Sequence, residues 1–361
     1  MTSFPIFAAM RSILLGFILC LLLTACGGRP GGASVSPGCD YARYFELTED
    51  AVITISPYDG IRDTLRLERP LDRLVYMSTS YIGYLDGIGC DSVVVGVSGI
   101  GYISQPALRT RYEATRQGRP GRELYDVGYD ADPDYERILA LEPDLLIAYS
   151  ISSAEPPYLR RLKELGIPVL LLSEHLEDHP LARSEYVRLF GALTGRRQQA
   201  DSLFAAIRTR YESLCVQASD PVPVLLNIPY ADQWFIPGED NYMAQLVRDA
   251  GGRVLGAEPG NASRTVSLEE AYLLAAQARA WLNPGWCRTR NQLVSQLPSF
   301  SRFDIPRIYN NIRRTTPEGG NDFWERGALR ADEILADLVR ILDEEKASPS
   351  EEELAWFIRV E

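Results

Sequence analysis

The chain has 361 residues, 46% of them hydrophobic, a composition typical of a well-packed globular fold. Its formal net charge is −12, with 37 Lys and Arg interspersed among 49 Asp and Glu, which argues against nucleic acid as a partner because phosphate binding requires clustered cations. This charge balance does not exclude small anionic ligands, which respond to local charge only.

Residues 1–25 have the pattern of a signal peptide. An apolar run from Ile13 to Leu23 follows the single cation Arg11 and is too short to span a bilayer. The residues LTACG, from Leu23 to Gly27, resemble a bacterial lipoprotein cleavage site. The resemblance implies that Cys26 becomes the first mature residue and carries diacylglycerol, whose two acyl chains suffice for stable anchoring. The alternative is an ordinary secretory peptide in which this cysteine is incidental.

Residues 26–40 are rich in Gly, Pro and Ser, so we expect a flexible tether before a folded part that begins near Tyr41. The sequence leaves open whether translation starts at Met1 or Met10. Once the signal peptide is removed and Cys26 is lipidated, the remaining cysteines permit two disulfides in three connectivities, or free thiols. These cysteines are Cys39, Cys90, Cys215 and Cys287.

The folded part has roughly 300 residues, which fits two domains better than one. Residues 51–67 alternate apolar and polar side chains around Tyr58-Asp59-Gly60 and predict a β-hairpin. Strand and helix signals then alternate across residues 41–180, and this βαβ order predicts a first lobe with parallel strands. Its expected strands are Leu74–Met77, Ser92–Val97, Asp144–Tyr149 and Val169–Leu172, with one helix ending at Gly87 and another at Tyr158–Leu165.

The middle of the chain has helical periodicity without a strand. Residues 184–193 and 196–216 predict helices that link two lobes within residues 181–218. The βαβ order resumes in a second lobe, residues 219–345, and residues 346–361 are expected to form a C-terminal tail. The second lobe's expected strands are Val224–Ile228, Ala280–Leu282 and Arg307–Tyr309, and its expected helices are Tyr242–Ala250, one running through Leu293, and Ala331–Leu342.

Each lobe contains one copy of the same pattern, a helix with a glutamate in its first turn that leads directly into an apolar strand. The copies are DPDYERILALEPDLLIAYS, Asp132 to Ser150, and VSLEEAYLLAAQARAWLNPG, Val266 to Gly285. Their glutamates are Glu136 and Glu269, and interaction with the helix dipole, worth about 0.3 to 1 kcal/mol, would explain either one alone. The expected fold class is therefore α/β, with two Rossmann-like lobes.

Several stretches between about Leu71 and Leu342 carry a family resemblance. They are RLVYMSTSYIGYLDGIG, VVGVS, DYERILALEPDLLIA, LKELGIPVLLL, LTGRRQQADSL, NYMAQLVRDAGG and VSLEEA. Their order resembles that of the substrate-binding proteins of ABC importers for iron complexes and cobalamin. The resemblance implies two lobes with mainly parallel sheets, joined by one long rigid helix. It also implies a monomeric, lipid-anchored receptor outside a bacterial membrane, which delivers its ligand to an ABC permease dimer with its ATPase.

In that family, one glutamate near the tip of each lobe docks onto permease arginines. By motif position the resemblance assigns this role to Glu136 in DYERI and Glu269 in VSLEE, with Glu270 as the alternative for the second. The resemblance implies no cofactor beyond the transported ligand. The sequence has no apparent nucleophile with a paired base, so the protein is not expected to be an enzyme.

The candidate ligand site follows from topology, because ligands of open α/β sheets bind beyond the carboxyl ends of the strands. Aromatic and amide side chains predominate in those loops and suit a large planar or amphipathic ligand. The arginines can pair with oxygens of a ferric chelate or lie in a solvated loop, and the tryptophans can instead pack in the core. The predicted ligand-binding residues are Ser80, Tyr81, Tyr102, Tyr149, Tyr230, Trp234, Trp286, Arg313, Arg314 and Trp324.

The sequence contains no complete motif for metal ligation or catalysis. The two histidines, His175 and His179, have helical spacing, but Pro180 displaces the second from a helix and there is no third, so a bare metal site is not expected. An axial haem ligand stays open at His175 or a tyrosine of the site. Residues 96–100 begin like a nucleophile elbow but have Ile100 where that motif requires glycine.

An iron chelate, either a siderophore or haem, is therefore the expected ligand, with cobalamin as the alternative. A second class of function also stays open: a binding protein of the same fold used for sensing or for chelatase-like chemistry rather than transport.

Overall fold

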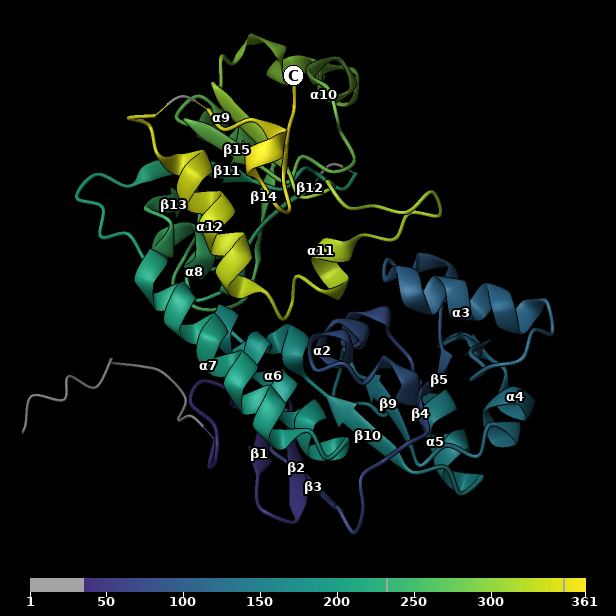
Figure 1. The fold of residues 1–361 in the computed structure, drawn as a ribbon. Coiled ribbons are helices and arrows are strands. Elements are labelled where there is room, and N and C mark those ends of the chain that lie inside the picture. Colours follow the sequence, from purple (N-terminus) through teal and green to yellow (C-terminus); the bar gives the residue numbers. More distant parts are fainter. Residues whose placement is uncertain (1–35, 232, 347) are drawn as a thin grey trace, which may run out of the picture. The chain divides into compact units, whose positions relative to one another are not determined.

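The computed structural model describes residues 36–231, 233–346 and 348–361 (Figure 1). The predicted signal peptide and Cys26 lie outside the described residues, as does the tether up to residue 35. Within the described part, two five-stranded sheets form the centres of two lobes. No helix in these three ranges is both long enough and apolar enough to cross a membrane.

The N-terminal lobe contains a fully parallel sheet with the strand order β10-β9-β4-β5-β6, which confirms the predicted βαβ organisation. A two-stranded ribbon of β7 and β8 precedes α4. The strands are β4 (Leu74–Tyr76), β5 (Val94–Val97), β6 (Tyr125–Asp126), β7 (Gly128–Tyr129), β8 (Asp132–Pro133), β9 (Leu145–Tyr149) and β10 (Val169–Leu172). The helices are α2 (Ile82–Gly87), α3 (Pro106–Arg116), α4 (Tyr135–Ala140) and α5 (Pro157–Glu164).

The C-terminal lobe has the strand order β13-β11-β15-β16-β17, with four parallel strands and an antiparallel edge strand, β17. A separate antiparallel ribbon pairs β12 with β14. The strands are β11 (Val222–Leu226), β12 (Gln233–Ile236), β13 (Gly252–Val254), β14 (Arg264–Ser267), β15 (Ala280–Leu282), β16 (Arg307–Asn310) and β17 (Ile358–Arg359). The helices are α8 (Tyr242–Asp249), α9 (Leu268–Ala275), α10 (Arg290–Gln296), α11 (Asp322–Glu325) and α12 (Ala331–Leu342).

The end of the chain differs from the prediction that residues 346–361 form a tail. β17 pairs with β16, and the side chains of Trp356 and Phe357 are buried. The buried carboxylate of Asp337 in α12 accepts hydrogen bonds from the backbone N–H groups of Ala355 and Trp356, the latter at 2.7 Å. The last residues therefore cover the edge of the sheet and complete the C-terminal lobe.

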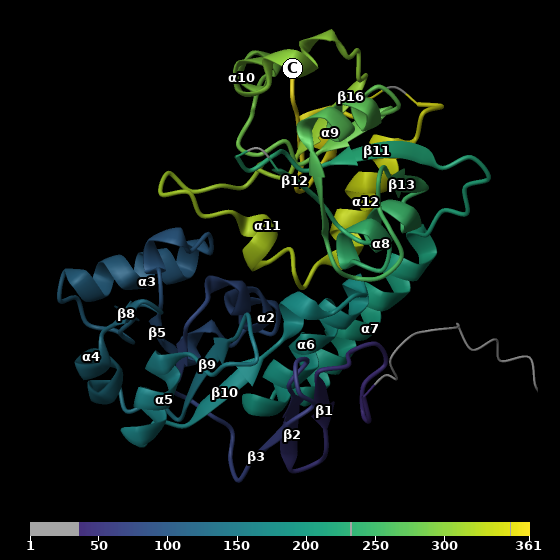
Figure 2. The same ribbon diagram turned by 180° about the vertical axis from the view of Figure 1, so that it is seen from behind.

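Two helices connect the lobes, α6 (Pro180–Leu193) and α7 (Arg197–Leu214). They pack against each other so closely that a Cβ on Gly191 would lie 2.4 Å from the Cβ of Ala200. The longer helix, α7, continues to the C-terminal lobe and packs against α12 (Figures 1 and 2). The expected helical connection is present, and it consists of a helix pair of which α7 is the bridging member.

The predicted β-hairpin is present as β2 (Ala51–Ile55) and β3 (Arg62–Arg66), which pair antiparallel, with β1 (Phe45–Leu47) on the other side of β2. This small sheet packs against α6, where the rings of Phe45 and Tyr186 lie 4.6 Å apart. The buried carboxylate of Glu177 accepts hydrogen bonds from the backbone N–H groups of Arg43 and Tyr44. The hairpin is thus fixed to the N-terminal lobe and the linking helices.

Candidate ligand-binding site

Unpartnered polar atoms are concentrated at the carboxyl ends of the strands. Among the described residues, nine buried side-chain nitrogen or oxygen atoms lack a hydrogen-bond partner, and seven of them lie at or after the carboxyl end of a strand. Buried polar atoms are normally paired, so unpaired ones at one edge indicate a place where a ligand or water supplies the partner. The seven are the hydroxyl of Tyr76, Oγ of Ser104, Oε2 of Glu174, Nε2 of His175, Oδ1 of Asn283, Oδ1 of Asn310 and Nδ2 of Asn311.

Exposed aromatic rings lie in the segments that follow strands of both sheets. Large aromatic side chains are usually at least partly buried, so several exposed ones in these segments favour a binding surface. Four of them were predicted from the sequence, and Tyr129 was missed. The five are Tyr102, Tyr129, Tyr230, Trp286 and Trp324.

Tyr102 and Tyr129 form a pair beside Gly99 in the N-terminal lobe. Gly99 has a φ of 67°, and a Cβ at this position would lie 3.2 Å from the ring of Tyr102 and 3.3 Å from that of Tyr129. Interaction with the neighbouring Tyr102 raises the pKa of Tyr129. Glycine therefore gives both the left-handed turn after β5 and the space in which two phenol groups meet.

The half-buried residues Tyr149 and Ser80 also lie at the carboxyl edge of this sheet. The ring of Tyr149 makes an edge contact with His175, with centroids 6.0 Å apart, and burial is the main cause that raises its pKa. The hydroxyl groups of Ser80 and Ser78 are 2.8 Å apart and hydrogen bonded. Both predicted residues can thus contact a ligand at this edge.

Two predicted ligand-binding residues are core residues instead. Tyr81 is 0% exposed and donates its hydroxyl to the backbone oxygen of Ala148. Trp234 is also 0% exposed; its indole N–H donates to the backbone oxygen of Leu226 at 2.8 Å, and its ring packs against Trp281. The sequence prediction was wrong for both, because each ring faces the interior and its polar atom is already satisfied.

The aromatic loops of the C-terminal lobe have a rigid support. Asn227 and Asn283, which follow β11 and β15, have left-handed backbones with φ of 70° and 58°. The side-chain amide of Asn310 donates to the backbone oxygens of Gly285 at 2.8 Å and Cys287 at 2.9 Å. These bonds fix the loop that presents Trp286 to solvent.

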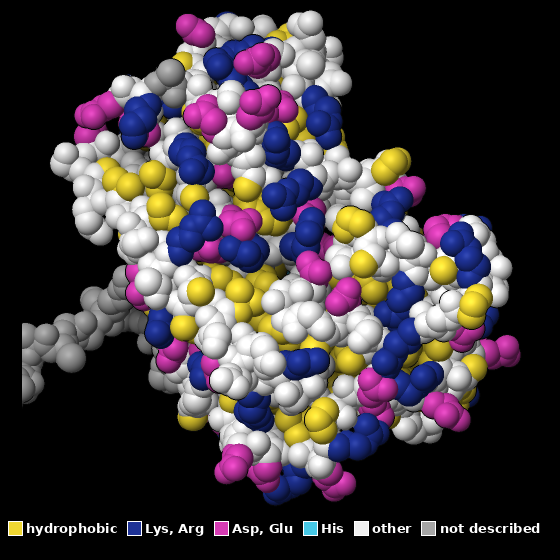
Figure 3. Space-filling model, viewed as in Figure 1, with side chains coloured by type: hydrophobic (Ala, Val, Ile, Leu, Met, Phe, Trp, Pro, Cys, Tyr) yellow, Lys and Arg dark blue, Asp and Glu magenta, His cyan; other side chains and the backbone are white. Residues whose placement is uncertain are grey.

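Arg313 and Arg314, which were predicted together, have different surroundings. Arg313 lies 3.6 Å from Glu351, whereas the guanidinium of Arg314 lies 4.5 Å above the ring of Trp356 and 3.6 Å from Asp322. Arg314 lines a cavity of about 230 Å³ that Arg326 and Arg330 also line. Figure 3 shows basic side chains gathered near the middle of the face in view, among acidic ones. Of the two predicted arginines, Arg314 is the one that lines this cavity.

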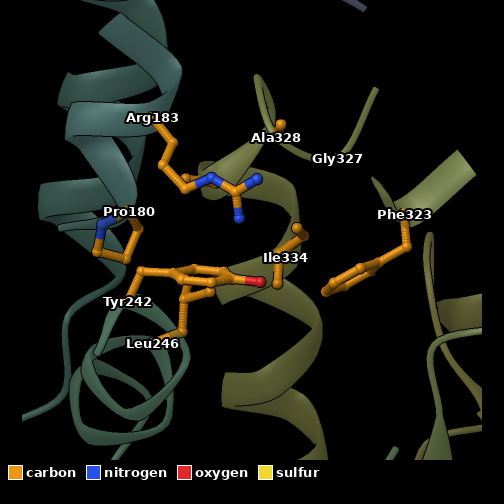
Figure 4. A pocket seen from close by; sticks show the side chains of 9 residues that line it. Pro180, Arg183, Tyr242, Leu246, Phe323, Gly327, Ala328 and Ile334 are labelled. Carbon is orange, nitrogen blue, oxygen red and sulfur yellow. The ribbon is translucent and has the colours of Figure 1, made fainter. Parts of the chain in front are cut away.

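A second, much smaller cavity of about 10 Å³ lies where α6 meets the C-terminal lobe (Figure 4). There the guanidinium of Arg183 lies 4.3 Å from the ring centroid of Tyr242, and Phe323 of α11 also lines the space. This volume accommodates about one water molecule. Arg183 therefore fastens the linking helix to α8 rather than binding a ligand.

A cavity of about 340 Å³ lies between the β-hairpin and the loop that follows β9. The hydroxyl of Tyr58 in the hairpin donates to the backbone oxygen of Ser150 at 3.1 Å. The charged groups Lys163 and Glu155 in its wall pair with each other at 2.8 Å. This cavity is distinct from the aromatic loops of the C-terminal lobe.

Neither histidine is arranged as a metal ligand. Nδ1 of His179 accepts a hydrogen bond from the backbone N–H of Leu181 and caps α6, and Nε2 of His175 is inaccessible. Across residues 36–231, 233–346 and 348–361, no group of three or more His, Cys, Asp and Glu side chains could hold a metal ion. The four cysteines in these ranges are free thiols.

The two predicted docking glutamates are exposed in the first turns of short capped helices. Glu136 follows Asp134, whose side chain caps α4, and Glu269 follows Ser267, whose hydroxyl caps α9. Glu270, the alternative, is bound to Arg264 at 2.5 Å. Glu269 is thus the acid of this pair that is available to a partner.

The chain belongs to the family described as periplasmic binding protein, whose sequence pattern matches residues 74–298. This family and its fold are those of solute-binding proteins, and the match spans both lobes.

Individual relatives extend this similarity over most of the chain. An uncharacterized lipoprotein of Methanocaldococcus jannaschii is 23% identical over 76% of this chain, and the alignment covers 66% of that relative, just under two thirds of its length. The Fe(3+) dicitrate-binding periplasmic protein FecB of Escherichia coli is 22% identical over 77% of this chain and 87% of its own. A periplasmic heme binding protein of Pseudomonas aeruginosa has the same fold, with a TM-score of 0.57 and 21% identity over 81% of this chain and 98% of its own.

Proposed function

We propose that this protein is a lipid-anchored receptor of an ABC importer, which captures an iron chelate, a siderophore or haem, between its lobes and delivers it to a membrane permease. The observation that carries the binding role is the concentration of unpartnered polar atoms and exposed aromatic rings at the strand ends of both lobes. Relatives named for Fe(3+) dicitrate and heme support the ligand class, and a relative named as a lipoprotein supports the anchor.

The chemistry of the loops fits such a chelate. Exposed rings such as Tyr102, Trp286 and Trp324 can stack on a planar or amphipathic ligand. The side-chain N–H of Asn311 can donate to a ligand oxygen, and Oδ1 of Asn283 can accept from a ligand hydroxyl or N–H group. Arg314 can pair with a ligand carboxylate, since a guanidinium binds that group through two parallel hydrogen bonds. A fully coordinated ferric siderophore needs no protein ligand, which agrees with a site built from aromatic and amide groups. Haem would leave an axial position of its iron for a tyrosine of the site.

Delivery would use Glu136 and Glu269. One exposed carboxylate on each lobe gives two separate points of attachment, and each lies in a first helical turn whose capping side chain fixes its position. Basic side chains on a permease would complement this pair. Two linked contacts bind far more tightly than either alone, provided that their spacing is fixed.

A binding panel tests the proposal. The full chain, purified in mild detergent, would be titrated with hemin, ferric citrate, a ferric hydroxamate siderophore and cobalamin, and followed by tryptophan fluorescence and by calorimetry. Saturable one-to-one binding of hemin or of a ferric chelate is the expected result. Binding of cobalamin alone would show that the ligand is a corrinoid rather than an iron chelate and would still support the receptor role. Absence of binding to all four ligands would contradict the proposal and favour a sensing or chelatase-like role on the same fold.

A further inference from the structure

One buried carboxylate of the C-terminal lobe is bound to the backbone of the N-terminal lobe. Oε2 of Glu325 accepts a hydrogen bond from the backbone N–H of Ser104 at 2.7 Å, and its Oε1 accepts one from Gln105 at 3.0 Å. Glu325 is the last residue of α11 and is only 2% exposed. Figures 1 and 2 show α11 on the side of the C-terminal lobe that faces α2 and α3.

Backbone packing reinforces this contact. A Cβ on Gly320 would lie 2.0 Å from the backbone oxygen of Tyr102, and one on Gly83 of α2 would lie 2.6 Å from the backbone oxygen of Glu325. Both glycines therefore allow main chains of opposite lobes to touch. An exposed ion pair between Arg109 and Glu318, at 3.3 Å, also crosses between the lobes, but exposed pairs of this kind contribute only about 0 to 1 kcal/mol.

The position of Glu325 matters because of its neighbours in the chain. Its bonding partners, Ser104 and Gln105, come two and three residues after Tyr102, and Glu325 itself follows Trp324 directly. Tyr102 and Trp324 are both exposed rings, one from each lobe. The hydrogen-bonded carboxylate thus ties the loop that carries one ring to the short helix that carries the other.

We propose that Glu325 is a positioning residue that fixes Trp324 relative to Tyr102 across the two lobes and so sets the spacing of the ligand site before a ligand binds. The effect of Glu325 on ligand binding rests on the proposed function. The hydrogen bonds themselves are present without a ligand. Each carboxyl oxygen of Glu325 accepts one backbone N–H group and the side chain is buried, which suits a contact that must persist in the empty receptor.

The charged groups around Glu325 belong to several elements. Asp322 and Arg326 flank it along the chain, and Arg326 forms two hydrogen bonds with Asp322 and lies 3.9 Å from Asp86 of α2. The side chain of Gln105 donates to both Asp86 and Asp91. Burial in this acidic setting is the main cause that raises the pKa of Glu325 to about 7, against the opposing effect of the bond from Ser104.

The sign of the pH effect follows from that shift. An exposed, undocked Glu325 would have a pKa near 4.5, below its docked value of about 7. Protons therefore bind preferentially to the docked form, so the contact gains stability as pH falls from about 7 towards 4.5 and is weakest above pH 7. Receptors at acidic pH should hold their lobes together more firmly.

Amide hydrogen exchange on the ligand-free full chain tests the contact directly. In Glu325→Ala, the protection factors of the Ser104 and Gln105 amides are expected to fall at least about 10-fold, because both N–H groups lose a charged acceptor. Glu318→Gln is the matched control, since it removes the exposed crossing ion pair, and it should change them less than about 2-fold. Glu325→Gln keeps the shape and one acceptor and should restore part of the protection and abolish its pH dependence. Unchanged protection in a folded Glu325→Ala protein would overturn the inference.

The consequence for binding is measured separately, with hemin and ferric citrate as probes. Glu325→Ala is expected to weaken the binding of the probe that saturates the wild type by about 10-fold, with Glu318→Gln unchanged. Equal affinity of Glu325→Ala and wild type would overturn the positioning role. If neither probe binds the wild-type chain, the proposed function fails for these ligands, while the exchange measurement still decides whether Glu325 ties the lobes together.

Discussion

Tyr211, in the last turn of the linking helix α7, donates a 2.6 Å hydrogen bond from its hydroxyl to Oδ2 of Asp249, the last residue of α8. Tyr211 is buried, and the amide of Gln245 also bonds this carboxylate. The pair fastens the bridging helix to the C-terminal lobe, as Arg183 and Tyr242 do at the start of α6. The geometry of the link between the lobes therefore depends on buried polar contacts as well as on apolar packing.

Tyr211→Phe is expected to lower the free energy of unfolding by about 1.5 to 3 kcal/mol, because a buried hydrogen bond to a charged acceptor is lost. Urea denaturation followed by circular dichroism measures the change. Tyr41→Phe is the matched control, since the hydroxyl of Tyr41 donates to Glu212 at a similar 2.7 Å but in an exposed setting. A loss in the control as large as that in Tyr211→Phe would contradict the role given to burial.

Gly191→Ala is expected to destabilise the protein by about 1 to 3 kcal/mol, because the new methyl group would meet Ala200 at 2.4 Å and α6 would have to move away from α7. Thermal unfolding measures the effect. Gly101→Ala, whose Cβ would have nothing within 4 Å, should change the melting temperature little. Equal melting temperatures for the two variants would show that the helix pair is not tightly packed.

The stability of the protein is expected to fall as pH rises from about 5 to 7. Burial is the main cause that raises the pKa of Glu177 to about 7, against the backbone bonds from Arg43 and Tyr44, and the pKa of Glu325 is raised to the same value. Both folded-state values exceed the unfolded value near 4.5, so the folded state binds more protons in this window. As pH rises, each group then lowers the free energy of unfolding by at most about 1.4 kcal/mol per pH unit.

Glu177→Gln isolates one of these contributions. Denaturant unfolding at pH 5, 6 and 7 should give a shallower pH dependence for this variant than for the wild type, because glutamine does not titrate. An identical pH dependence of the two proteins would contradict the raised pKa of Glu177.

Reversal of both docking charges, Glu136→Lys with Glu269→Lys, is expected to reduce ligand delivery at least about 10-fold without unfolding the protein, because each exposed carboxylate would become repulsive to a basic partner. The measurement is ligand uptake by cells that carry the variant. Glu68→Lys with Glu352→Lys is the matched control, since it changes the net charge equally at exposed acids elsewhere. Unchanged uptake in the first variant, with the protein folded and anchored, would refute the docking role.

Segments with periodic apolar residues were predicted well, because burial of one face requires apolar side chains at regular spacing. β10, β15 and α12 have the predicted bounds to the residue, and each is apolar on the buried face or throughout. α3 was missed because Leu108 is its only fully buried side chain, so its sequence has almost no apolar period. β17 was missed because it is two residues long and forms only by pairing with β16.

The position of the candidate site follows from topology, whereas the surroundings of its individual residues do not. Topology placed it beyond the carboxyl ends of the strands, where the unpartnered polar atoms lie. Residue type alone did not distinguish the buried Trp234 from the exposed Trp286. Side chains of β12 are alternately exposed and buried, so Trp234 points inward and Phe235 points outward. Glu325 has no local signal, because its partners are 220 and 221 residues away in the sequence.

If the proposed function holds, a metal chelate binds beyond the carboxyl ends of both sheets. Anomalous diffraction at the iron edge, from crystals of the protein grown with the ferric chelate that saturates it, tests this most directly. We expect one iron peak beside the loops of Tyr102 and Trp286. A peak in the cavity between Tyr58 and Ser150, or on the surface away from these loops, would contradict it.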